Sequence, residues 1–468
     1  MTAWDTEVDV AVVGGGACGI MTALRAARDP NLVVAVFEKS AREGCNAAIS
    51  SGSLAAGGTR FQAAAGIDDS PERHADDILR ASGDEEWRPV VEALCAAAPE
   101  FVEWIADTGY PIEIGTDMPR AGMSAPRLHT DTGRLGGGRL MRHLRGLLEG
   151  HDNIAFVDEA PVVDLVSGNG EVAGVVVSQN GTSQRVRAGA VVLAADGFAA
   201  DRTLVEQHLP HLGTPFYGGV STSTGDALAW ASRFGGRLRN MGAGLRSGLV
   251  VVDHGTRVSP ALQFNGAVLV NLDGERFVDE ESKGYSSLAG ILQQQPRERA
   301  AMIWDATAMA ATRESEMMRE CLAAGAVHDR PAIEDLAASL GRTVAETGRA
   351  LTPLPGRRRL TAPFHFAWVT HGLLATQGGL VIDPSGRVLD GEGEPVPGLY
   401  AGGGTACGLA GPHSDGYMSG NGLLSAFGMG WIIGTGLAAG PVLSRRRRRR
   451  PSPWPAPPRS CASGTGGR

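Results

Sequence analysis

A glycine-rich turn near the start of this 468-residue chain constrains the fold more than any other sequence feature. The turn Gly14-Gly15-Gly16-Ala17-Cys18-Gly19 follows the β-branched run 8–13 and precedes an Ala- and Leu-rich segment that ends at Asp29-Pro30. A second apolar run, 32–37, then ends at Glu38. This order of strand, glycine turn, helix, strand and terminal acid predicts a βαβ unit that binds a dinucleotide.

The residues of this motif have separate physical tasks in such a unit. Gly14 permits the tight turn, Gly16 lets the backbone approach a pyrophosphate, and Gly19 lets the helix pack on the strand. The start of the helix supplies N–H groups and a positive dipole end, and Glu38 accepts hydrogen bonds from ribose hydroxyls. The motif alone does not separate NAD from FAD, and a glycine turn in an ordinary α/β protein is the competing interpretation.

Composition narrows the class of protein further. The 43% hydrophobic content can bury a large core, and no run approaches the ~18 to 20 apolar residues that cross a bilayer. The first strand begins almost at once, without a signal segment, so we expect a cytoplasmic protein with no membrane span. The six cysteines lack the spacing of a zinc or iron–sulfur site, so we predict neither a metal site nor a disulfide framework.

The net charge of −8 is unevenly distributed along the chain. The segment after residue 440 holds eight of the 43 basic residues and no acidic one, so the rest of the chain is more acidic still. A body of that charge argues against a nucleic-acid partner, because phosphate contacts need cations. The run Arg445–Arg450 and the Pro-rich stretch after it predict a disordered tail over 441–468, with an anionic partner for the tail as the alternative.

The rest of the chain alternates between helical and strand-like texture. We expect helices over 70–150, strands over 154–193, a helix near 225–235, a strand at 267–271, an Ala-rich helical region near 296–350, strands at 380–383 and 398–401, and an apolar helix near 423–437. No internal repeat is visible, and the pattern suggests one α/β domain interrupted by a second.

Five short segments carry a resemblance to a known superfamily. They are Asn46 to Gly58, Ala194 to Phe198, Thr224 to Ala227, Pro397 to Gly403 and Ser419 to Leu424. Together they resemble the soluble fumarate reductase and succinate dehydrogenase flavoproteins, including the 3-ketosteroid dehydrogenases, over about residues 7–440. The resemblance implies an α/β fold in which a Rossmann-like FAD-binding domain of the two-dinucleotide-binding type is interrupted by an α+β capping domain.

The same resemblance implies domain boundaries and a cofactor. The FAD-binding domain would comprise 1–244 and 371–440, the cap 245–370, and the bound dinucleotide would be FAD rather than NAD. Superfamily members with covalent FAD place a His at or near the position of Asn46, and none occurs here, so we predict non-covalent FAD. The residues implied for FAD binding are Gly14, Gly16, Ala17, Cys18, Gly19, Glu38, Lys39, Ser40, Asn46, Ala47, Ser51, Gly52, Val162, Ala195, Gly197, Asp226, Gly403, Gly404, Asn421, Leu423 and Leu424.

The residues that would bind a dicarboxylate in a fumarate reductase are missing. The matching positions hold Pro260, Gln263, Gly284, Ala375 and Tyr417. A dicarboxylate would lose several charge-assisted hydrogen bonds of ~1.5–3 kcal/mol each. The sequence therefore argues against fumarate or succinate as the substrate.

Two tyrosines lie at or next to those positions, a pattern that resembles the ketosteroid dehydrogenase branch. Removing hydrogens beside a carbonyl needs a donor to the carbonyl oxygen, a base for the α-proton and a hydride acceptor, here flavin N5. Tyr285 is the candidate acid/base and Tyr417 the candidate carbonyl donor or base partner; either could instead simply line a cleft. The predicted enzyme interconverts C–C single and double bonds of a ketone or enone, with a separate electron acceptor or donor.

Two other functions stay open. A fumarate reductase-like or amino-acid oxidase-like enzyme acting on a carboxylate would use Arg120, Arg127 or Arg134 in place of the missing cations. A flavin electron carrier or redox sensor would have no substrate of its own. A capping domain argues against the carrier, because excluding water over a flavin serves substrate chemistry.

A few polar residues are weaker candidates. His371 either faces the substrate or is structural. Arg127, His129 and Arg134 precede a Gly-rich turn and are expected in loop capping or at the surface. His413-Ser414-Asp415 looks like a fragment of a hydrolase triad, but a hydrolase would not need the FAD-binding set.

Overall fold

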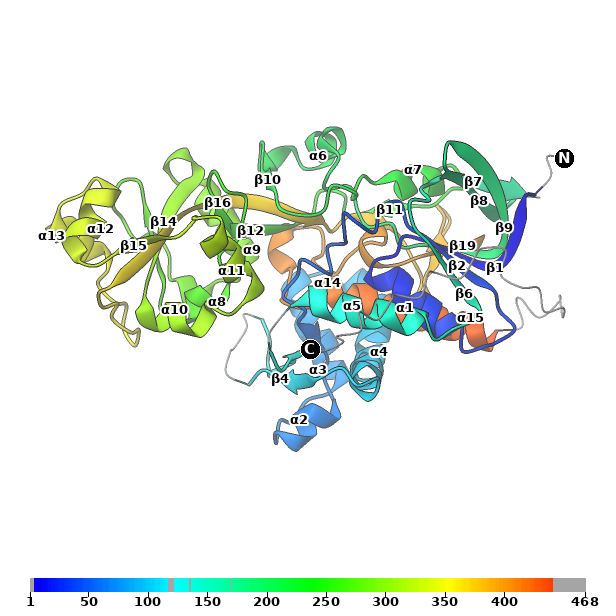
Figure 1. Ribbon diagram of the computed structural model, residues 1–468, viewed down its shortest axis with the longest axis horizontal. Coiled ribbons are helices and arrows are strands. Elements are labelled where there is room, and N and C mark those ends of the chain that lie inside the picture. Colours follow the sequence, from blue (N-terminus) through cyan, green and yellow to red (C-terminus); the bar gives the residue numbers. More distant parts are fainter. Residues whose placement is uncertain (1–3, 117–121, 134–135, 169, 441–468) are drawn as a thin grey trace, which may run out of the picture.

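The computed structural model describes residues 4–116, 122–133, 136–168 and 170–440. The predicted tail at 441–468 lies outside this described part, as do the side chains of Tyr285 and Glu316. Two bodies lie side by side in Figure 1, one built on an eight-stranded sheet and the other on a six-stranded sheet.

The eight-stranded sheet has a parallel centre. Strand β1 (Thr6–Val13) pairs with β2 (Val34–Phe37) on one side and with β9 (Thr182–Leu193) on the other. The parallel pairing continues to β6 (Ile154–Val157) beyond β2 and to β19 (Pro395–Ala401) beyond β9. Because helices cover such a sheet, its strands are continuous apolar runs, and residues 10–12 are fully buried. The predicted βαβ start of the chain and the α/β fold class are confirmed.

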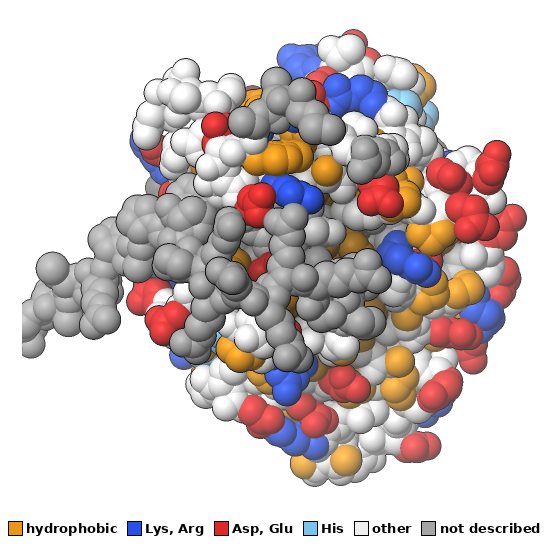
Figure 2. Space-filling model, turned by 90° about the vertical axis from the view of Figure 1, so that its right-hand side faces the viewer, with side chains coloured by type: hydrophobic (Ala, Val, Ile, Leu, Met, Phe, Trp, Pro, Cys, Tyr) orange, Lys and Arg blue, Asp and Glu red, His pale blue; other side chains and the backbone are white. Residues whose placement is uncertain are grey.

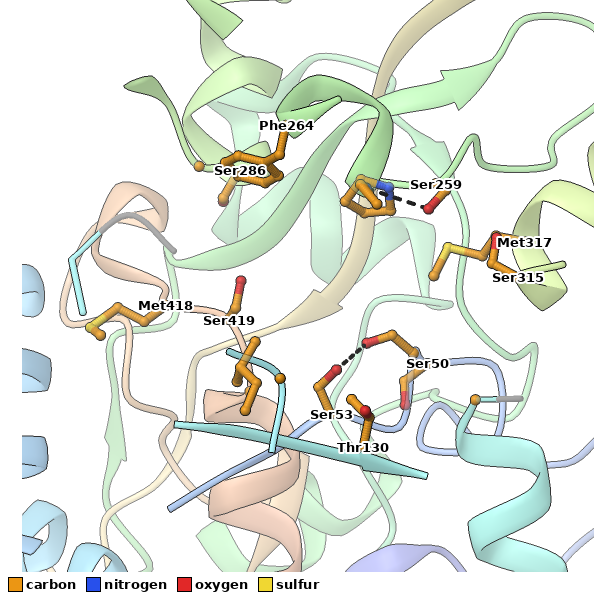
Figure 3. A pocket seen from close by; sticks show the side chains of 18 of the residues that line it. Ser50, Ser53, Thr130, Ser259, Phe264, Ser286, Ser315, Met317, Met418 and Ser419 are labelled. Carbon is orange, nitrogen blue, oxygen red and sulfur yellow. Dashed lines mark hydrogen bonds between the residues drawn. The ribbon is translucent and has the colours of Figure 1, made fainter. Parts of the chain in front are cut away.

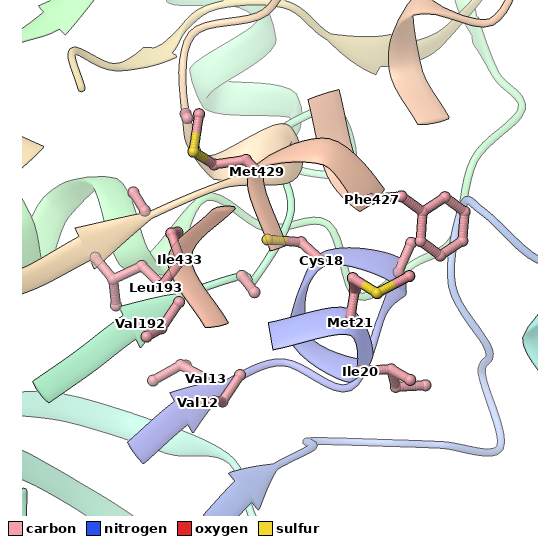
Figure 4. Packing of buried hydrophobic residues seen from close by; sticks show 14 of the residues in the cluster. Val12, Val13, Cys18, Ile20, Met21, Val192, Leu193, Phe427, Met429 and Ile433 are labelled. Carbon is pink, nitrogen blue, oxygen red and sulfur yellow. The ribbon is translucent and has the colours of Figure 1, made fainter. Parts of the chain in front are cut away.

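Helix α1 (Ala17–Ala26) packs between the sheet and the last helix, α15 (Met429–Ala439). The two helices approach closely because α15 has glycines at the contact: a Cβ on Gly430 would lie 2.5 Å from the Cys18 carbonyl oxygen, and one on Gly434 2.5 Å from that of Thr22. Figure 4 shows side chains of both helices meeting those of β1 and β9 in this core. The two ends of the chain therefore share one core.

The remaining elements of this body surround that core. They are β3 (Leu54–Ala55), α2 (Arg60–Ala64), α3 (Pro71–Ser82), α4 (Arg88–Asp107), β4 (Ile112–Ile114), β5 (Leu128–Asp131), α5 (Gly137–Leu148), β7 (Val162–Gly168), β8 (Glu171–Gln179), α6 (Arg202–His208), α7 (Asp226–Ser232), β11 (Leu238–Arg239), β17 (Gly379–Leu380), β18 (Arg387–Leu389) and α14 (Asn421–Leu423). The expectation of helix throughout 70–150 is wrong at β4 and β5, which form a small antiparallel sheet with β3.

The six-stranded sheet is organised by β16 (Phe364–Thr376). This long strand pairs with every other strand of its sheet except β13 and runs from the body at the left of Figure 1 toward the other body. The other elements here are β10 (Phe216–Tyr217), β12 (Gly244–Val251), α8 (Ala261–Phe264), β13 (Val268–Asn271), α9 (Tyr285–Gln293), β14 (Arg299–Asp305), α10 (Ala306–Thr312), α11 (Glu316–Ala323), β15 (His328–Arg330), α12 (Ile333–Leu340) and α13 (Val344–Ala350). The expected helical region 296–350 is thus interrupted by β14 and β15.

The apolar residues form separate cores in the two bodies. The buried residues of one large cluster come from 8–231 and 373–437, and those of two smaller clusters come from 249–369. The predicted boundary near 244 coincides with the start of β12, and that near 370 falls inside β16 rather than in a loop. The antiparallel pair β12–β16 therefore links the bodies.

One described helix, Asn421–Ala439, is long and apolar enough to cross a membrane by length and composition alone, although the sequence suggested no such span. Half of its most apolar window is buried within the protein, where α15 packs on α1.

On the face shown in Figure 2, acidic side chains gather along one margin, with basic side chains set among them. The absence of a nucleic-acid partner stays a prediction.

Candidate functional site

Three cavities meet at Tyr417, which lines all of them. The glycine-loop cavity, about 220 Å³, lies at the turn between β1 and α1 and is lined by Gly14, Gly16 and Ala17. The outer cavity, about 370 Å³, lies between the two bodies. The inner cavity, about 120 Å³, shares lining residues with both of the others. A ligand that extends from one cavity to the next would pass Tyr417.

The glycine turn is fixed by two close contacts and leaves one position open. Gly14 has φ +104°, and a Cβ there would lie 2.3 Å from the Ala194 carbonyl oxygen. A Cβ on Gly19 would lie 1.9 Å from the Gly14 carbonyl oxygen, so packing requires both glycines. At Gly16 the nearest atom to such a Cβ is Cys45 Cβ at 3.7 Å. Protein packing does not require glycine there, whereas close approach of a pyrophosphate does, which fits FAD.

The acidic residue at the end of β2 is oriented by backbone donors. Glu38 accepts hydrogen bonds from the N–H groups of Gly15 at 2.7 Å and Ser40 at 2.8 Å, one at each carboxylate oxygen. Each oxygen keeps a further acceptor site, as contact with ribose hydroxyls requires. Beside it, Lys39 Nζ donates to Thr224 at 2.7 Å and Asp226 at 3.2 Å.

Asn46 is held by three groups at the far side of the glycine-loop cavity. Its Nδ2 donates to Asp196 Oδ2 at 2.6 Å and to Ser223 Oγ at 3.3 Å, and its Oδ1 accepts from the Val220 N–H at 3.0 Å. Asp196 has φ +64° and also accepts from the Ser223 hydroxyl at 2.6 Å. Both ends of the Asn46 amide are therefore used to position the loop along the cavity.

The C-terminal segment completes the cavity. Gly403, Gly404 and Leu423 line it, and the helix that begins at Asn421 starts beside it. Asn421 is 1% exposed, and neither its Nδ2 nor its Oδ1 has a hydrogen-bond partner in the described part of the chain. Buried amides are normally paired, so this unpaired amide is unusual, and it lies at the start of a helix whose Leu423 lines the cavity.

Most of the residues predicted for FAD binding come together here. Those that line the glycine-loop cavity are Gly14, Gly16, Ala17, Cys18, Glu38, Lys39, Asn46, Ala47, Val162, Ala195, Asp226, Gly403, Gly404 and Leu423. Ser51 lines the outer and inner cavities instead. Those outside the lining are Gly19, Ser40, Gly52, Gly197, Asn421 and Leu424.

Two of the residues outside the lining have packing roles. A Cβ on Gly52 would lie 2.8 Å from the Gly136 backbone, and one on Gly197 would lie 2.0 Å from Thr376 Oγ1. Glycine is therefore required at both positions for reasons of packing.

Sequence reasoning missed other residues that line this cavity, among them Cys45, Trp230 and Gln377. Burial raises the pKa of the Cys18 thiol to about 12 and that of the Cys45 thiol to about 11. Both thiols therefore stay neutral beside the expected phosphates, where a thiolate would repel them. Local sequence gave no signal for these residues, because the fold alone brings them to the cavity.

The outer cavity is rich in hydroxyl groups. Figure 3 shows Ser419 and Thr130 across the space from Phe264 and Ser286. Three of the five positions where a fumarate reductase would have charged groups line this cavity: Pro260, Gly284 and Tyr417. No Lys, Arg or His occurs among its described lining residues. Another of these positions, Gln263, is buried and donates to the Lys283 carbonyl oxygen at 2.8 Å.

The inner cavity contains a cation that sequence reasoning missed. Arg257 lines it together with Ser247 and Tyr417, and Arg257 Nη2 donates to the Ile49 carbonyl oxygen at 2.9 Å. The segment around Arg257 carries no motif; the hairpin that follows β12 brings it here through a bridge to Val250.

The two candidate catalytic tyrosines differ in what the structure describes. The Tyr417 phenolic oxygen accepts a hydrogen bond from the Gly422 N–H at 3.0 Å. Tyr285 begins helix α9 between Gly284 and Ser286, which both line the outer cavity, but its side chain lies outside the described part.

Arg127 is occupied by a buried ionic network. It pairs with Asp69, with Nε to Oδ2 at 2.7 Å, and with Asp77, and all three side chains have no solvent exposure. The expected surface position of Arg127 and His129 is wrong, since both are fully buried, Arg127 in the loop just before β5 and His129 within β5. Arg127 already has two carboxylate partners and is not placed to bind a substrate, while Arg120 and Arg134 lie outside the described residues.

The remaining polar candidates serve other contacts. His371 is buried on β16, where Nε2 lies 2.9 Å from Glu298 Oε2, and it lines none of the three cavities. Ser414 Oγ accepts from the Gly244 N–H at 3.1 Å, and no hydrogen bond joins it to His413 among the described residues. Within the same part of the chain, no group of three His, Cys, Asp or Glu side chains could hold a metal ion.

Comparison with known proteins gives one matching family and several related reductases. The profile of the FAD-binding domain family matches residues 9–423. NADH:fumarate oxidoreductase of Klebsiella pneumoniae is 27% identical over 91% of this chain and 47% of its own length. Urocanate reductase of Eggerthella lenta is 28% identical over 93% of this chain and 75% of its own length. The chain thus spans about half the length of the first relative and about three quarters of the second.

Two solved structures have a fold similar to that of this chain. A 3-ketosteroid-Δ4-(5α)-dehydrogenase from Rhodococcus jostii, in complex with 4-androstene-3,17-dione, is 27% identical with a TM-score of 0.72, over 94% of this chain and 98% of that one. The open conformation of a flavocytochrome c3 fumarate reductase is 24% identical with a TM-score of 0.79, over 93% and 79%. Because the fumarate reductase is only 24% identical, its similarity shows a shared fold and nothing more.

Proposed function

The chain belongs to the FAD-binding domain family, and on that premise we propose that it is an oxidoreductase that interconverts a C–C single and double bond next to a carbonyl. The substrate is a ketone or enone bound in the inner and outer cavities. The electron acceptor or donor is a separate molecule, and the protein is cytoplasmic.

One observation carries this proposal: Tyr417 stands where the glycine-loop, inner and outer cavities meet. A substrate that extends from the outer cavity into the glycine-loop cavity passes this phenol and Ser50, which also lines all three cavities. The described lining of the outer cavity has no cation for a dicarboxylate, so a phenolic donor suits an uncharged carbonyl better than a carboxylate pair.

The contacts of Tyr417 define what it does in this reaction. Its oxygen accepts from the Gly422 N–H, which orients the ring, and a phenolic O–H can donate to the carbonyl oxygen of a bound substrate. Polarising that carbonyl acidifies the neighbouring α-carbon, whose proton the candidate base Tyr285 would take or return. Bound FAD would supply the hydride acceptor or donor for the β-carbon.

The family supports FAD in the glycine-loop cavity, and the contacts of Asn46 support a non-covalent attachment. Both ends of the Asn46 amide are hydrogen-bonded, and an amide is no nucleophile for attachment to a flavin. The large core with its glycine turn would be the FAD-binding domain, in its predicted two parts, and the body built on the six-stranded sheet would be the cap.

The proposal is tested by mixing oxidised holoenzyme anaerobically with saturated cyclic ketones. We expect the flavin absorbance to bleach and the enone to form in equal amount. The proposal is overturned if the FAD-bound holoenzyme stays oxidised with every ketone tested and if cyclic enones also leave the reduced form unchanged. The electron-carrier alternative predicts that result.

Arg257 favours a second candidate, a carboxylate-directed enzyme. It is the described cation in the inner cavity, and one guanidinium can pair with one carboxylate. This candidate predicts competitive inhibition by small dicarboxylates that weakens at least tenfold in Arg257→Gln, because a charge-assisted hydrogen bond is worth ~1.5–3 kcal/mol. The ketone proposal predicts weak dicarboxylate inhibition that Arg257→Gln leaves within a few-fold.

A further inference from the structure

The hydroxyl groups of the outer cavity fall into two sets. Most of them already serve the protein: Ser50 donates to the Ala47 carbonyl oxygen at 2.7 Å, Ser286 to that of Ser414 at 3.2 Å, and Ser315 to that of Thr312 at 2.7 Å. Ser51 and Ser53 hydrogen-bond to each other at 3.1 Å. These hydroxyls maintain the shape of the wall.

The second set is available to a ligand. The hydroxyls of Thr130, Ser287 and Ser419 line the cavity and have no hydrogen-bond partner among the residues that the structure describes. They come from three separate places: strand β5, helix α9 and the segment just after Tyr417. Three uncommitted hydroxyls around one cavity indicate a ligand that has several hydrogen-bonding groups of its own.

The charges of the cavity indicate that this ligand is not an anion. The charged side chains in the described lining are Glu320 and Asp415, both exposed at the surface. Carboxylates in the wall of a cavity repel anions and raise no barrier to an uncharged molecule. Phe264, Met317 and Met418 supply apolar contacts for a carbon skeleton (Figure 3).

We propose that the outer cavity binds the uncharged, hydroxylated body of an alicyclic ketone or enone whose reacting carbonyl lies beside Tyr417. This inference rests on the proposed function and narrows its substrate class. Thr130, Ser287 and Ser419 then set specificity, because each exchanges hydrogen bonds with a hydroxyl that a hydrocarbon-bodied ketone lacks.

The experiment uses two matched probes, cyclohex-2-enone and 4,5-dihydroxycyclohex-2-enone, with the oxidised holoenzyme. Binding is measured from the change in the flavin spectrum. We expect the dihydroxy enone to bind at least tenfold more tightly. We expect Thr130→Val, Ser287→Ala and Ser419→Ala each to weaken its binding about 2- to 12-fold, the range for one neutral hydrogen bond, and to leave the parent enone within twofold. Ser385→Ala, in a remote exposed turn, is the control and changes neither.

Failure of this inference is distinguishable from failure of the proposed function. If both enones reoxidise the reduced holoenzyme but bind equally well, or if the three variants do not discriminate between them, the function stands and the hydroxylated substrate class is wrong. If neither enone reoxidises the reduced holoenzyme, both the proposed function and the hydroxylated substrate class are wrong.

Discussion

The phenolic oxygen of Tyr417 accepts a hydrogen bond from the backbone N–H of Gly422 at 3.0 Å, so the helix that begins at Asn421 orients the phenol. The same helix start lies beside the glycine-loop cavity through Leu423. This geometry joins the orientation of a candidate carbonyl donor to the segment that completes the cofactor site.

The first prediction concerns the hydroxyl of Tyr417. Tyr417→Phe keeps the ring but removes the donor, so we expect the chemical step to slow about 10²- to 10⁴-fold, the usual range for a general acid. FAD content and enone affinity should change little. Single-turnover kinetics on flavin-replete protein measure this, with Tyr400→Phe on β19 as the control. Unchanged turnover in Tyr417→Phe would remove this residue from the chemistry.

A matched pair of glycine variants separates cofactor binding from folding. Gly16→Ala meets no protein atom closer than 3.7 Å, so the apoprotein should keep its stability while FAD affinity falls at least tenfold. Gly19→Ala places a Cβ 1.9 Å from the Gly14 carbonyl oxygen, so the apoprotein itself should be destabilised by several kcal/mol, in the upper tail for single substitutions. Denaturation midpoints of both apoproteins and FAD titrations check this pair. Equal effects of the two variants on apoprotein stability would contradict it.

We also predict that the flavin leaves the chain on denaturation. Acid precipitation of the holoenzyme should release all of the yellow colour into the supernatant. Asn46→Ala removes the contacts with Asp196 and Val220 and should weaken FAD binding by about 1–3 kcal/mol. Flavin fluorescence in the washed pellet would contradict the non-covalent assignment.

Two buried histidines predict a loss of stability in acid. Burial lowers the pKa of His74 to about 3 and that of His129 to about 4, below the ordinary value of 6.5. Below pH 6.5 the unfolded chain binds protons that the folded protein does not. Each histidine therefore costs about 1.4 kcal/mol of stability per pH unit, down to its folded pKa.

The contribution of His74 to this loss is measured with one substitution. Neither of its ring nitrogens has a hydrogen-bond partner in the described chain, so His74→Met removes a titrating group without leaving a broken pair. Urea denaturation of the variant at pH 7 and pH 5 should show a smaller difference in stability than the wild type. An equal difference would show that His74 does not titrate in this way.

The sequence predicted the features that depend on local chemistry. The glycine turn with Glu38 predicted the βαβ unit, because the strand, the turn, the helix and the terminal acid follow one another within residues 8–38. Tyr417 was also found from the sequence, through its place in a Gly-rich segment that resembles a known superfamily.

What the sequence missed depends on contacts between distant segments. Strand β16 pairs with four separate strands, so no local pattern marks its length. Arg127 suggested a substrate cation, but Asp69 and Asp77, 58 and 50 residues earlier, occupy it. Arg257 stands in no motif and reaches the inner cavity only because β12 and the chain after it fold back together.

The most direct test of the central claim is a competition between two oxidants for the reduced holoenzyme. Dithionite-reduced protein is mixed anaerobically with cyclohex-2-enone and, separately, with fumarate, and the return of oxidised flavin absorbance is followed. We predict that the enone reoxidises the flavin at least a hundredfold faster than fumarate and that Tyr417→Phe abolishes most of that difference. Rapid reoxidation by fumarate, with the enone inert, would contradict the assignment of a ketone substrate.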